Sequence, residues 1–206
     1  MPTETAADGP QPDLRRRMRR QRRALPARER TARALELTRH LVDHPLFLRS
    51  RRIAGYLAVN GEMDAAPLMQ RGLAMRKAVH LPVLVPYRYN RLWFAPCDAG
   101  TRLVANRYGI PEPAVPRRAL INPVSLDLVL VPLVAFDRHC NRLGMGGGYY
   151  DRTFGFLRHR GNWRKPHLVG LAYEFQRVSN LDRQPWDVPL TAVATERGLY
   201  WPQPIE

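Results

Sequence analysis

The 206-residue sequence contains no apolar run near the roughly 20 residues that a helix needs to span a bilayer. Its start, MPTETAADGPQPD, lacks the apolar segment of a secretory signal and includes three acidic residues, which disfavours a transit peptide. Cysteine is scarce as well, because Cys97 and Cys140 are too few for a disulfide framework or a metal-ligand cluster. We therefore expect a cytoplasmic protein with two reduced thiols and no membrane partner.

Acidic residues are few: the sequence has 18 of them against 33 lysines and arginines, and the formal net charge is +15. Such an excess suits nucleic acid, a membrane surface or a small polyanionic substrate as the binding partner. Seven of the arginines lie in RRRMRRQRR, Arg15–Arg23; without them, 26 basic residues face 18 acidic ones. A nucleic-acid-binding protein that uses this helix is the alternative function. It is disfavoured because the aromatic residues do not interleave with the arginines and no RNA-binding motif is present.

Periodicity and composition predict one α/β domain over residues 13–206, after a disordered Pro-, Thr- and Ala-containing tail over residues 1–12. Helices are expected at 13–25, 26–44, 65–75 and 149–159, and the first has a narrow apolar stripe of Leu14, Met18 and Leu25. Strands are expected near 53–59, 77–86, 91–96, 126–136, 167–173 and 191–202, whereas the proline-rich segment 109–123 is expected to be loop. This alternation predicts a mostly parallel central sheet with helices on both faces, in Rossmann-like layers.

The stretch RLGMGGGYYDR, Arg142–Arg152, holds four glycines between the buried 126–136 strand and a helix. In parallel sheets such a junction lies at the edge where ligands bind. Glycines can take positive φ, so that successive N–H groups converge on an anion, and the flanking arginines can add charge-assisted hydrogen bonds. A glycine-rich turn without chemical purpose is the simpler interpretation, but the position and the arginines favour a phosphate site.

Two common nucleotide motifs are absent from this stretch. It does not fit G-x-x-x-x-G-K-[ST], and Tyr149 stands where G-x-G-x-x-G requires its third glycine. No acidic residue follows at the distance expected for a ribose contact, so a nicotinamide oxidoreductase is disfavoured.

The longer stretch VPLVAFDRHCNRLGMGGGYYDRTF resembles the signature of the 5-formyltetrahydrofolate cyclo-ligase family, also called 5,10-methenyltetrahydrofolate synthetases. Four further pieces agree in order and spacing: LRRRMRRQRRAL, GEMD, YGIPEP and PWDVPLTAVATE. The resemblance covers Leu14 to Trp201. It implies an ATP- and Mg²⁺-dependent ligase that converts 5-formyltetrahydrofolate to 5,10-methenyltetrahydrofolate and releases ADP and phosphate. In the implied reaction ATP phosphorylates the formyl oxygen and N10 attacks the same carbon, so the protein contributes positioning and charge neutralisation.

The resemblance also implies site residues, with Arg142 and Tyr150 as the catalytic ones. The implied ATP-binding residues are Arg15, Arg142, Leu143, Gly144, Met145, Gly146, Gly147, Gly148, Tyr149 and Tyr150. The implied folate-binding residues are Leu57, Glu62, Met145, Gly146, Gly147, Gly148 and Tyr149, and the implied Mg²⁺ ligands are Asp151 and Asp187. Without the family, each carboxylate has a simpler interpretation. Glu62 would be a solvated loop residue, Asp151 a first-turn residue favoured by the helix dipole, and Asp187 a turn former.

Two positions depart from the family pattern. Gln11 stands where the family commonly has a lysine four residues before Arg15, and Cys140 stands where it usually has glycine. We expect Asn141 to adopt the left-handed turn conformation in place of that glycine. The expected partners are ATP and a reduced folate, with no nucleic acid, and the expected oligomeric state is a monomer.

Overall fold

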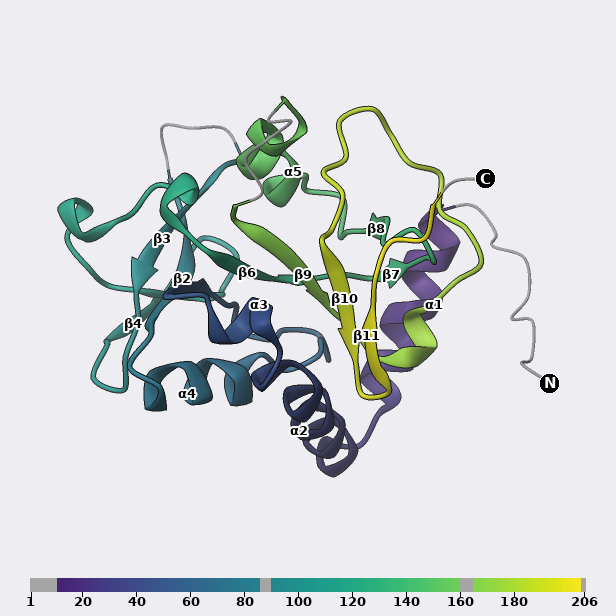
Figure 1. Cartoon of the computed structure of the whole chain (residues 1–206), viewed down its shortest axis with the longest axis horizontal. Coiled ribbons are helices and arrows are strands. Elements are labelled where there is room, and N and C mark those ends of the chain that lie inside the picture. Colours follow the sequence, from purple (N-terminus) through teal and green to yellow (C-terminus); the bar gives the residue numbers. More distant parts are fainter. Residues whose placement is uncertain (1–10, 86–89, 160–164, 205–206) are drawn as a thin grey trace.

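The computed structural model describes residues 11–85, 90–159 and 165–204 (Figure 1). Its α-helices are α1 (Gln11–Ala24), α2 (Ala27–Val42), α3 (Pro45–Leu48), α4 (Ala66–Ala74) and α5 (Tyr149–Phe154), the last continued by a 3₁₀ turn over Gly155–His159. Its strands are β1 (Arg52–Ala54), β2 (Ala78–Leu84), β3 (Leu92–Pro96), β4 (Leu103–Ala105), β5 (Pro111–Pro113), β6 (Leu128–Pro132), β7 (Ala135–Phe136), β8 (Arg142–Leu143), β9 (His167–Leu171), β10 (Ala192–Thr195) and β11 (Gly198–Tyr200). Most of the expected tail, residues 1–10, lies outside the described residues, and Gln11 and Pro12 already belong to α1.

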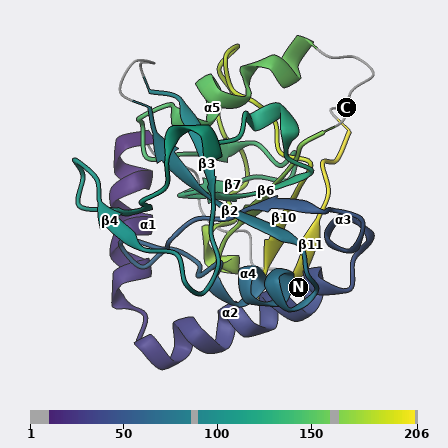
Figure 2. The same cartoon turned by 90° about the vertical axis from the view of Figure 1, so that its left-hand side faces the viewer.

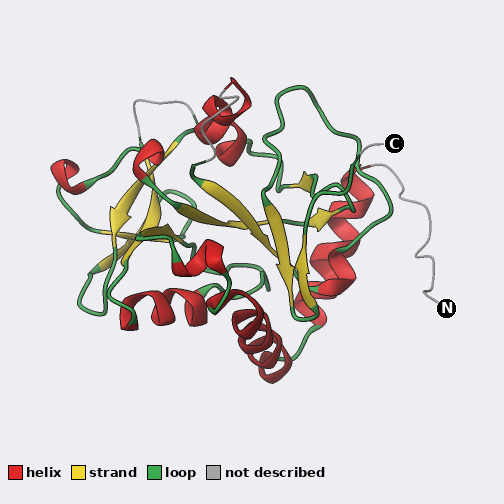
Figure 3. Cartoon of the chain, viewed as in Figure 1, coloured by secondary structure: helices red, strands yellow, loops and turns green. Residues whose placement is uncertain are grey.

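Seven strands form the central sheet, in the order β11-β10-β9-β6-β1-β2-β3. The five inner strands are parallel, and only the edge strands β3 and β11 run antiparallel to their neighbours. Residues 128–131 of the central strand β6 are fully buried, as its continuous apolar sequence predicts. The mostly parallel α/β sheet predicted from the sequence is therefore confirmed (Figure 3).

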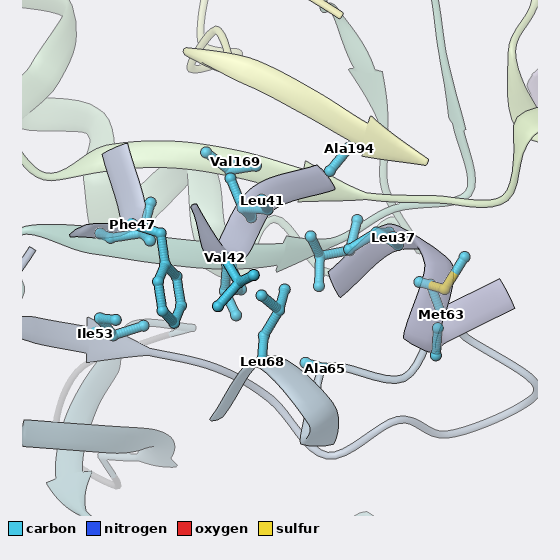
Figure 4. Close-up of a cluster of buried hydrophobic side chains, with 14 of the residues drawn as sticks. Leu37, Leu41, Val42, Phe47, Ile53, Met63, Ala65, Leu68, Val169 and Ala194 are labelled. Carbon is cyan, nitrogen blue, oxygen red and sulfur yellow. The ribbon is translucent and has the colours of Figure 1, made fainter. Parts of the chain in front are cut away.

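Helices cover both faces of the sheet, as predicted. On one face α2, α3 and α4 bury Leu41, Phe47 and Leu68 against Val169 of β9 and Ala194 of β10 (Figure 4). On the other face α5 and the turn after it pack against β6 and β9 in a second buried cluster. Each fully buried aliphatic or aromatic side chain contributes about 1.5–3 kcal/mol, so the two clusters fix the helices to the sheet.

The arginine-rich helix α1 lies at one edge of the molecule, as Figure 2 shows. Its apolar side packs on the β7–β8 hairpin, where Leu14 and Met18 contact a buried cluster. The predicted stripe is wrong at its third position. The next buried residue is Arg22, four residues after Met18, while Leu25 is only partly buried and packs on the main core. Residues spaced by four share a helix face, so Arg22 occupies a position that the pattern reserves for an apolar side chain.

The predicted strand 126–136 is divided in the structure. The chain leaves the central sheet after Pro132, and residues 135–136 then pair with Arg142–Leu143 in the separate β7–β8 hairpin. Between the two strands the Leu133 carbonyl accepts from Arg22 Nη1 and from Gln176 Nε2, so side chains replace a neighbouring strand there. The glycine stretch therefore follows a short hairpin rather than a sheet strand.

The proline-rich segment predicted to be loop contains the short strand β5, which pairs with β4. Proline is tolerated there because β4 and β5 form a separate two-stranded sheet, so the outer edge of β5 donates to no further strand. The predicted strand near 53–59 is also shorter than expected, since only Arg52–Ala54 pair. Nowhere in the described ranges does a helix have both the length and the apolar content that crossing a membrane requires.

Candidate active site

A cavity of about 1150 Å³ lies at the carboxyl ends of the parallel strands. Tyr56, just after β1, Leu84 at the end of β2 and Pro132 at the end of β6 all line it. Every site residue predicted from the sequence lines the same cavity: Arg15, Leu57, Glu62, Arg142, Leu143, Gly144, Met145, Gly146, Gly147, Gly148, Tyr149, Tyr150, Asp151 and Asp187. The space exceeds the usual size of a site for one drug-sized ligand, about 300–1,000 Å³, so it suits two ligands side by side.

The glycine loop, residues 144–148, is fixed from outside by side chains that bind its carbonyl oxygens. Arg15 Nε donates to the Gly144 carbonyl at 2.9 Å, and Arg152 Nη1 donates to that of Gly147 at 2.7 Å. Gly148 has φ 64°, and a Cβ there would lie 2.5 Å from Arg152 Nη1. The positive φ favours glycine at this position, and the absence of a Cβ leaves room for the Arg152 guanidinium. The loop is therefore a preformed part of the cavity wall.

Arg142 and Asp151 form a partly buried ion pair beside the loop. Arg142 Nη2 donates to Asp151 Oδ1, and Arg142 Nη1 donates to the Val188 carbonyl at 2.5 Å. The N–H of Val188 in turn donates to Asp151 Oδ1 at 3.1 Å. The Arg142 side chain is only 5% exposed, and two of its N–H groups donate to protein acceptors. The sequence did not predict this pairing, which makes Arg142 an orienting group for Asp151 as well as a cation at the cavity.

Asp187 lies on the segment that Arg142 and Asp151 hold, one residue before Val188. Its Oδ2 accepts from the Gln184 N–H at 2.8 Å. Within the described part of the chain, Asp151 Oδ2 and Asp187 Oδ1 accept no hydrogen bond from protein, and no cluster of three metal-ligating side chains occurs. Mg²⁺ in nucleotide sites commonly binds one or two carboxylates together with phosphate oxygens and water. The two aspartates fit that arrangement, in which the nucleotide supplies further oxygens.

Glu62 also lines this cavity and is only 9% exposed. A tight turn presents it, since Asn60 and Gly61 have φ 53° and 72° and the Val59 N–H donates to Glu62 Oε2 at 3.1 Å. Burial raises the pKa of Glu62, while the Val59 hydrogen bond and the charge of Arg22 lower it in part. The result is a carboxylate bonded to its own turn through one oxygen, with the second oxygen available for a ligand.

The two tyrosines of the glycine stretch have different surroundings. Tyr150 stacks on Phe154 with ring centroids 6.2 Å apart, and burial and the charge of Glu62 raise its pKa, so it stays a neutral phenol. The Tyr149 hydroxyl lies 2.8 Å from that of Tyr108, at the tip of the β4–β5 hairpin. Burial raises the pKa of Tyr149, but the hydrogen bonds of Tyr108 and Arg107 outweigh that effect and lower it overall. The hairpin tip thus contacts the first residue of α5, directly after the glycine loop.

Several cavity residues have no role in the sequence prediction. Tyr108 belongs to the YGIPEP piece, and Trp186, which is 60% exposed, belongs to PWD. Both could have been noticed as aromatic residues within the quoted motifs. Gln11 also lines the cavity, where it accepts from Arg15 Nη2 at 3.3 Å and donates to the Asp182 carbonyl. The departure from the family lysine therefore supplies a partner that orients Arg15.

The expectation for the turn at Cys140 is wrong. Cys140 itself takes the left-handed conformation, with φ 56°, and Asn141 does not. Asn141 Nδ2 instead donates to Asp137 Oδ2 at 2.9 Å, and this buried carboxylate also accepts from the N–H groups of His139 and Leu181. Because Asp137 binds Asn141 through both its backbone and its side chain, the strained position moves to the preceding residue.

Comparisons with known proteins agree on one family. The model of the 5-formyltetrahydrofolate cyclo-ligase family matches residues 8–196. The 5-formyltetrahydrofolate cyclo-ligase of Escherichia coli K12 is 36% identical over 185 residues, which cover 89% of this chain and 98% of the relative. That of Haemophilus influenzae is 38% identical over 156 residues, which cover 75% of this chain and 80% of the relative. Among solved structures, the 5,10-methenyltetrahydrofolate synthetase of Aquifex aeolicus aligns with a TM-score of 0.77 and 30% identity, over 95% of this chain and 96% of that one.

Proposed function

Because the chain belongs to the 5-formyltetrahydrofolate cyclo-ligase family, and is therefore a ligase of folate metabolism, we propose that it uses ATP and Mg²⁺ to make 5,10-methenyltetrahydrofolate. The substrate is 5-formyltetrahydrofolate, and ADP and phosphate are released. One observation carries this proposal: a single cavity brings together the glycine loop, the Asp151–Asp187 pair and Glu62. An anion site, a pair of hard oxygen ligands and an acceptor for N–H groups are what the two substrates require.

The glycine-loop side of the cavity binds the phosphates of ATP in this proposal. Arg15 and Arg142 supply positive charge there, and Arg142 holds Asp151 in place. Asp151 and Asp187 would hold Mg²⁺ together with the nucleotide, and the bound ion would neutralise charge at the phosphates. Met145 of the loop and Tyr149, the first residue of α5, line the same cavity and face the folate, where a thioether and an aromatic ring provide apolar contact.

The Glu62 side of the cavity binds the pterin. An ionised carboxylate can accept two N–H bonds from the amide edge of that ring, and the Glu62 turn is rigid enough to fix the ring's position. Leu57, on the strand side of the same wall, contacts the ring. Holding both substrates in one cavity brings the formyl oxygen to the γ-phosphorus, and such positioning supplies much of the rate enhancement.

The bond changes then follow without a protein nucleophile. The formyl oxygen attacks the γ-phosphorus, the bond to the β-phosphate oxygen breaks, and ADP leaves. N10 attacks the activated carbon and loses its proton, the carbon–oxygen bond breaks, and phosphate departs with the former formyl oxygen. In both steps the enzyme's residues neutralise charge and hold the attacking atom in line with the atom that it attacks.

An absorbance assay tests the proposed function. We expect the protein, incubated with 5-formyltetrahydrofolate, ATP and Mg²⁺, to produce the absorbance of methenyltetrahydrofolate together with one equivalent of ADP. Omitting ATP or chelating Mg²⁺ should stop the reaction. Absence of product at every ATP concentration would refute the proposal.

Replacing Arg15 should mainly weaken ATP binding. We expect Arg15→Met to raise the KM for ATP by about tenfold or more, since a hydrogen bond to a charged group is worth about 1.5–3 kcal/mol. Arg20→Met, an exposed arginine on the same helix, is the matched control and should leave the KM unchanged. Initial rates at varied ATP and fixed folate measure the effect. A change confined to the KM for folate would show that Arg15 faces the other substrate.

A further inference from the structure

Arg22 is a cation in a position that should be apolar. It is fully buried on α1, four residues after Met18 and eight after Leu14, on the face that packs against the protein. Other arginines of the helix, such as Arg20 and Arg23, are exposed. A buried charge without compensation is strongly destabilising. A buried arginine at this position therefore requires a nearby anion.

The hydrogen bonds of Arg22 leave most of its guanidinium unsatisfied. Nη1 donates to the Leu133 carbonyl at 3.2 Å, but Nε and Nη2 have no hydrogen-bond partner among the residues that the structure describes. Burial lowers the pKa of Arg22, and the strongest opposing effect is the negative charge of Glu62. Glu62 is therefore the anion that compensates this buried cation most.

The turn that carries Glu62 rests directly on Arg22. A Cβ on Gly61 would lie 2.8 Å from the Arg22 carbonyl oxygen and 3.3 Å from Arg22 Cβ, so the two backbones are in close contact. The neighbouring Arg23 Nη2 donates to Asn60 Oδ1 at 2.8 Å. Glu62 lines the cavity, whereas Arg22 is not among the residues that line it. Arg22 thus lies behind the wall on which Glu62 is displayed.

Four groups from different elements face Glu62: Arg22 of α1, Tyr56 after β1, Tyr150 of α5 and Tyr173 after β9. Burial raises the pKa of all three phenols, that of Tyr173 to about 12, so they remain neutral near neutral pH. Within this set Arg22 is the one permanent charge, and its field favours the ionised form of Glu62.

We propose that Arg22 is a positioning residue of the folate subsite, which lies against the turn at residues 60–62 and supplies the countercharge that keeps Glu62 an anion at the cavity. The inference rests on the proposed function, in which Glu62 accepts N–H bonds from the pterin. It gives α1 two tasks. Arg15 contacts the glycine loop, and Arg22, seven residues later on nearly the same face, sets the folate-binding carboxylate.

The test compares Arg22→Met with Arg22→Lys, which keeps the charge, and with Arg20→Met as the control on the same helix. We expect Arg22→Met to weaken 5-formyltetrahydrofolate binding about tenfold at neutral pH and to leave the Kd for ATP unchanged. The acid limb of folate binding should move upward by about one pH unit, because an opposite charge nearby lowers a carboxyl pKa by about 1–3 units. Arg22→Lys should restore most of the affinity. Unchanged folate binding with an unmoved acid limb, or equal weakening of both ligands, would overturn the proposal.

The Glu62 carboxyl can also be titrated without any ligand, by NMR of protein with ¹³C-labelled glutamate, with Glu62→Gln identifying the signal. We expect a higher pKa of Glu62 in Arg22→Met than in the wild type. If that shift is found but the wild type does not bind folate, the proposed function fails and the coupling of the two residues stands. If the wild type binds folate and the pKa of Glu62 is unmoved, only the role of Arg22 is refuted.

If Arg22→Met is too unstable for binding measurements, its melting temperature can be compared with that of a double variant. Removing one member of a buried charge pair is far more destabilising than removing both. We therefore expect the double variant Arg22→Met/Glu62→Gln to melt at a higher temperature than Arg22→Met alone. A double variant that is equally unfolded would contradict the pairing.

Discussion

Asp151→Asn is expected to lower kcat by about 100-fold or more and to leave the Kd for 5-formyltetrahydrofolate unchanged. Asparagine keeps the size of the side chain and an oxygen that can accept from the Val188 N–H, so the local fold is preserved. It removes the negative charge that binds Mg²⁺ in the proposed site and that pairs with Arg142. Loss of one preorganised electrostatic group commonly costs about 10²–10³ in kcat.

Asp182→Asn is the matched control for this variant, because the exposed Asp182 lies on the same cavity wall and its side chain has no part in the proposed site. It should keep kcat within about twofold, in line with the small effects of most surface substitutions. Steady-state rates at saturating ATP, with folate binding measured separately, give both quantities. Full turnover by Asp151→Asn would refute a metal role for this carboxylate.

Glu62→Gln is expected to weaken folate binding by about 10–100-fold, since hydrogen bonds to a charged group are worth about 1.5–3 kcal/mol. The glutamine still accepts from the Val59 N–H, so the turn should persist. Binding of ATP should be unchanged, because in the proposed site Glu62 binds the pterin and takes no part in the nucleotide subsite. Equilibrium titration of each ligand measures the two affinities, and equal loss of both would point to a misfolded cavity.

The pH dependence of folate binding provides a second signature of Glu62. Burial raises the pKa of this carboxyl, so protonation on lowering the pH should remove the acceptor at a higher pH than for an ordinary glutamate. Wild-type affinity should therefore fall as the pH drops through that raised value and recover above it. Glu62→Gln has no such group and should lack the acid limb. An identical limb in both proteins would assign it to another group.

The fold was largely predictable because burial leaves a direct trace in the sequence. The continuous apolar run of β6 indicates a strand buried on both faces, and the structure confirms the parallel sheet that it implies. The short strands were not predictable in this way. The β7–β8 hairpin has two residues on each side, and its position depends on side-chain bonds to the Leu133 and Val134 carbonyls.

The candidate site was predicted from its motifs, and the contacts between those motifs were not. Arg22 binds a carbonyl 111 residues away and lies under a turn from another part of the chain. Its neighbours on the helix are also arginines, so composition alone suggests a solvated face. The four-residue spacing after Leu14 and Met18 was the available signal. The pairing of Arg142 with Asp151 left no comparable trace, because it depends on how the hairpin and α5 are arranged.

The most direct measurement of the central claim follows the formyl oxygen. Substrate labelled with ¹⁸O in the formyl group is incubated with the protein, ATP and Mg²⁺, and the product and the released phosphate are analysed by absorbance and mass spectrometry. If ATP phosphorylates the formyl oxygen, each methenyltetrahydrofolate formed should be matched by one phosphate that carries one ¹⁸O atom. Product accompanied by unlabelled phosphate, or no product at all, would contradict the account.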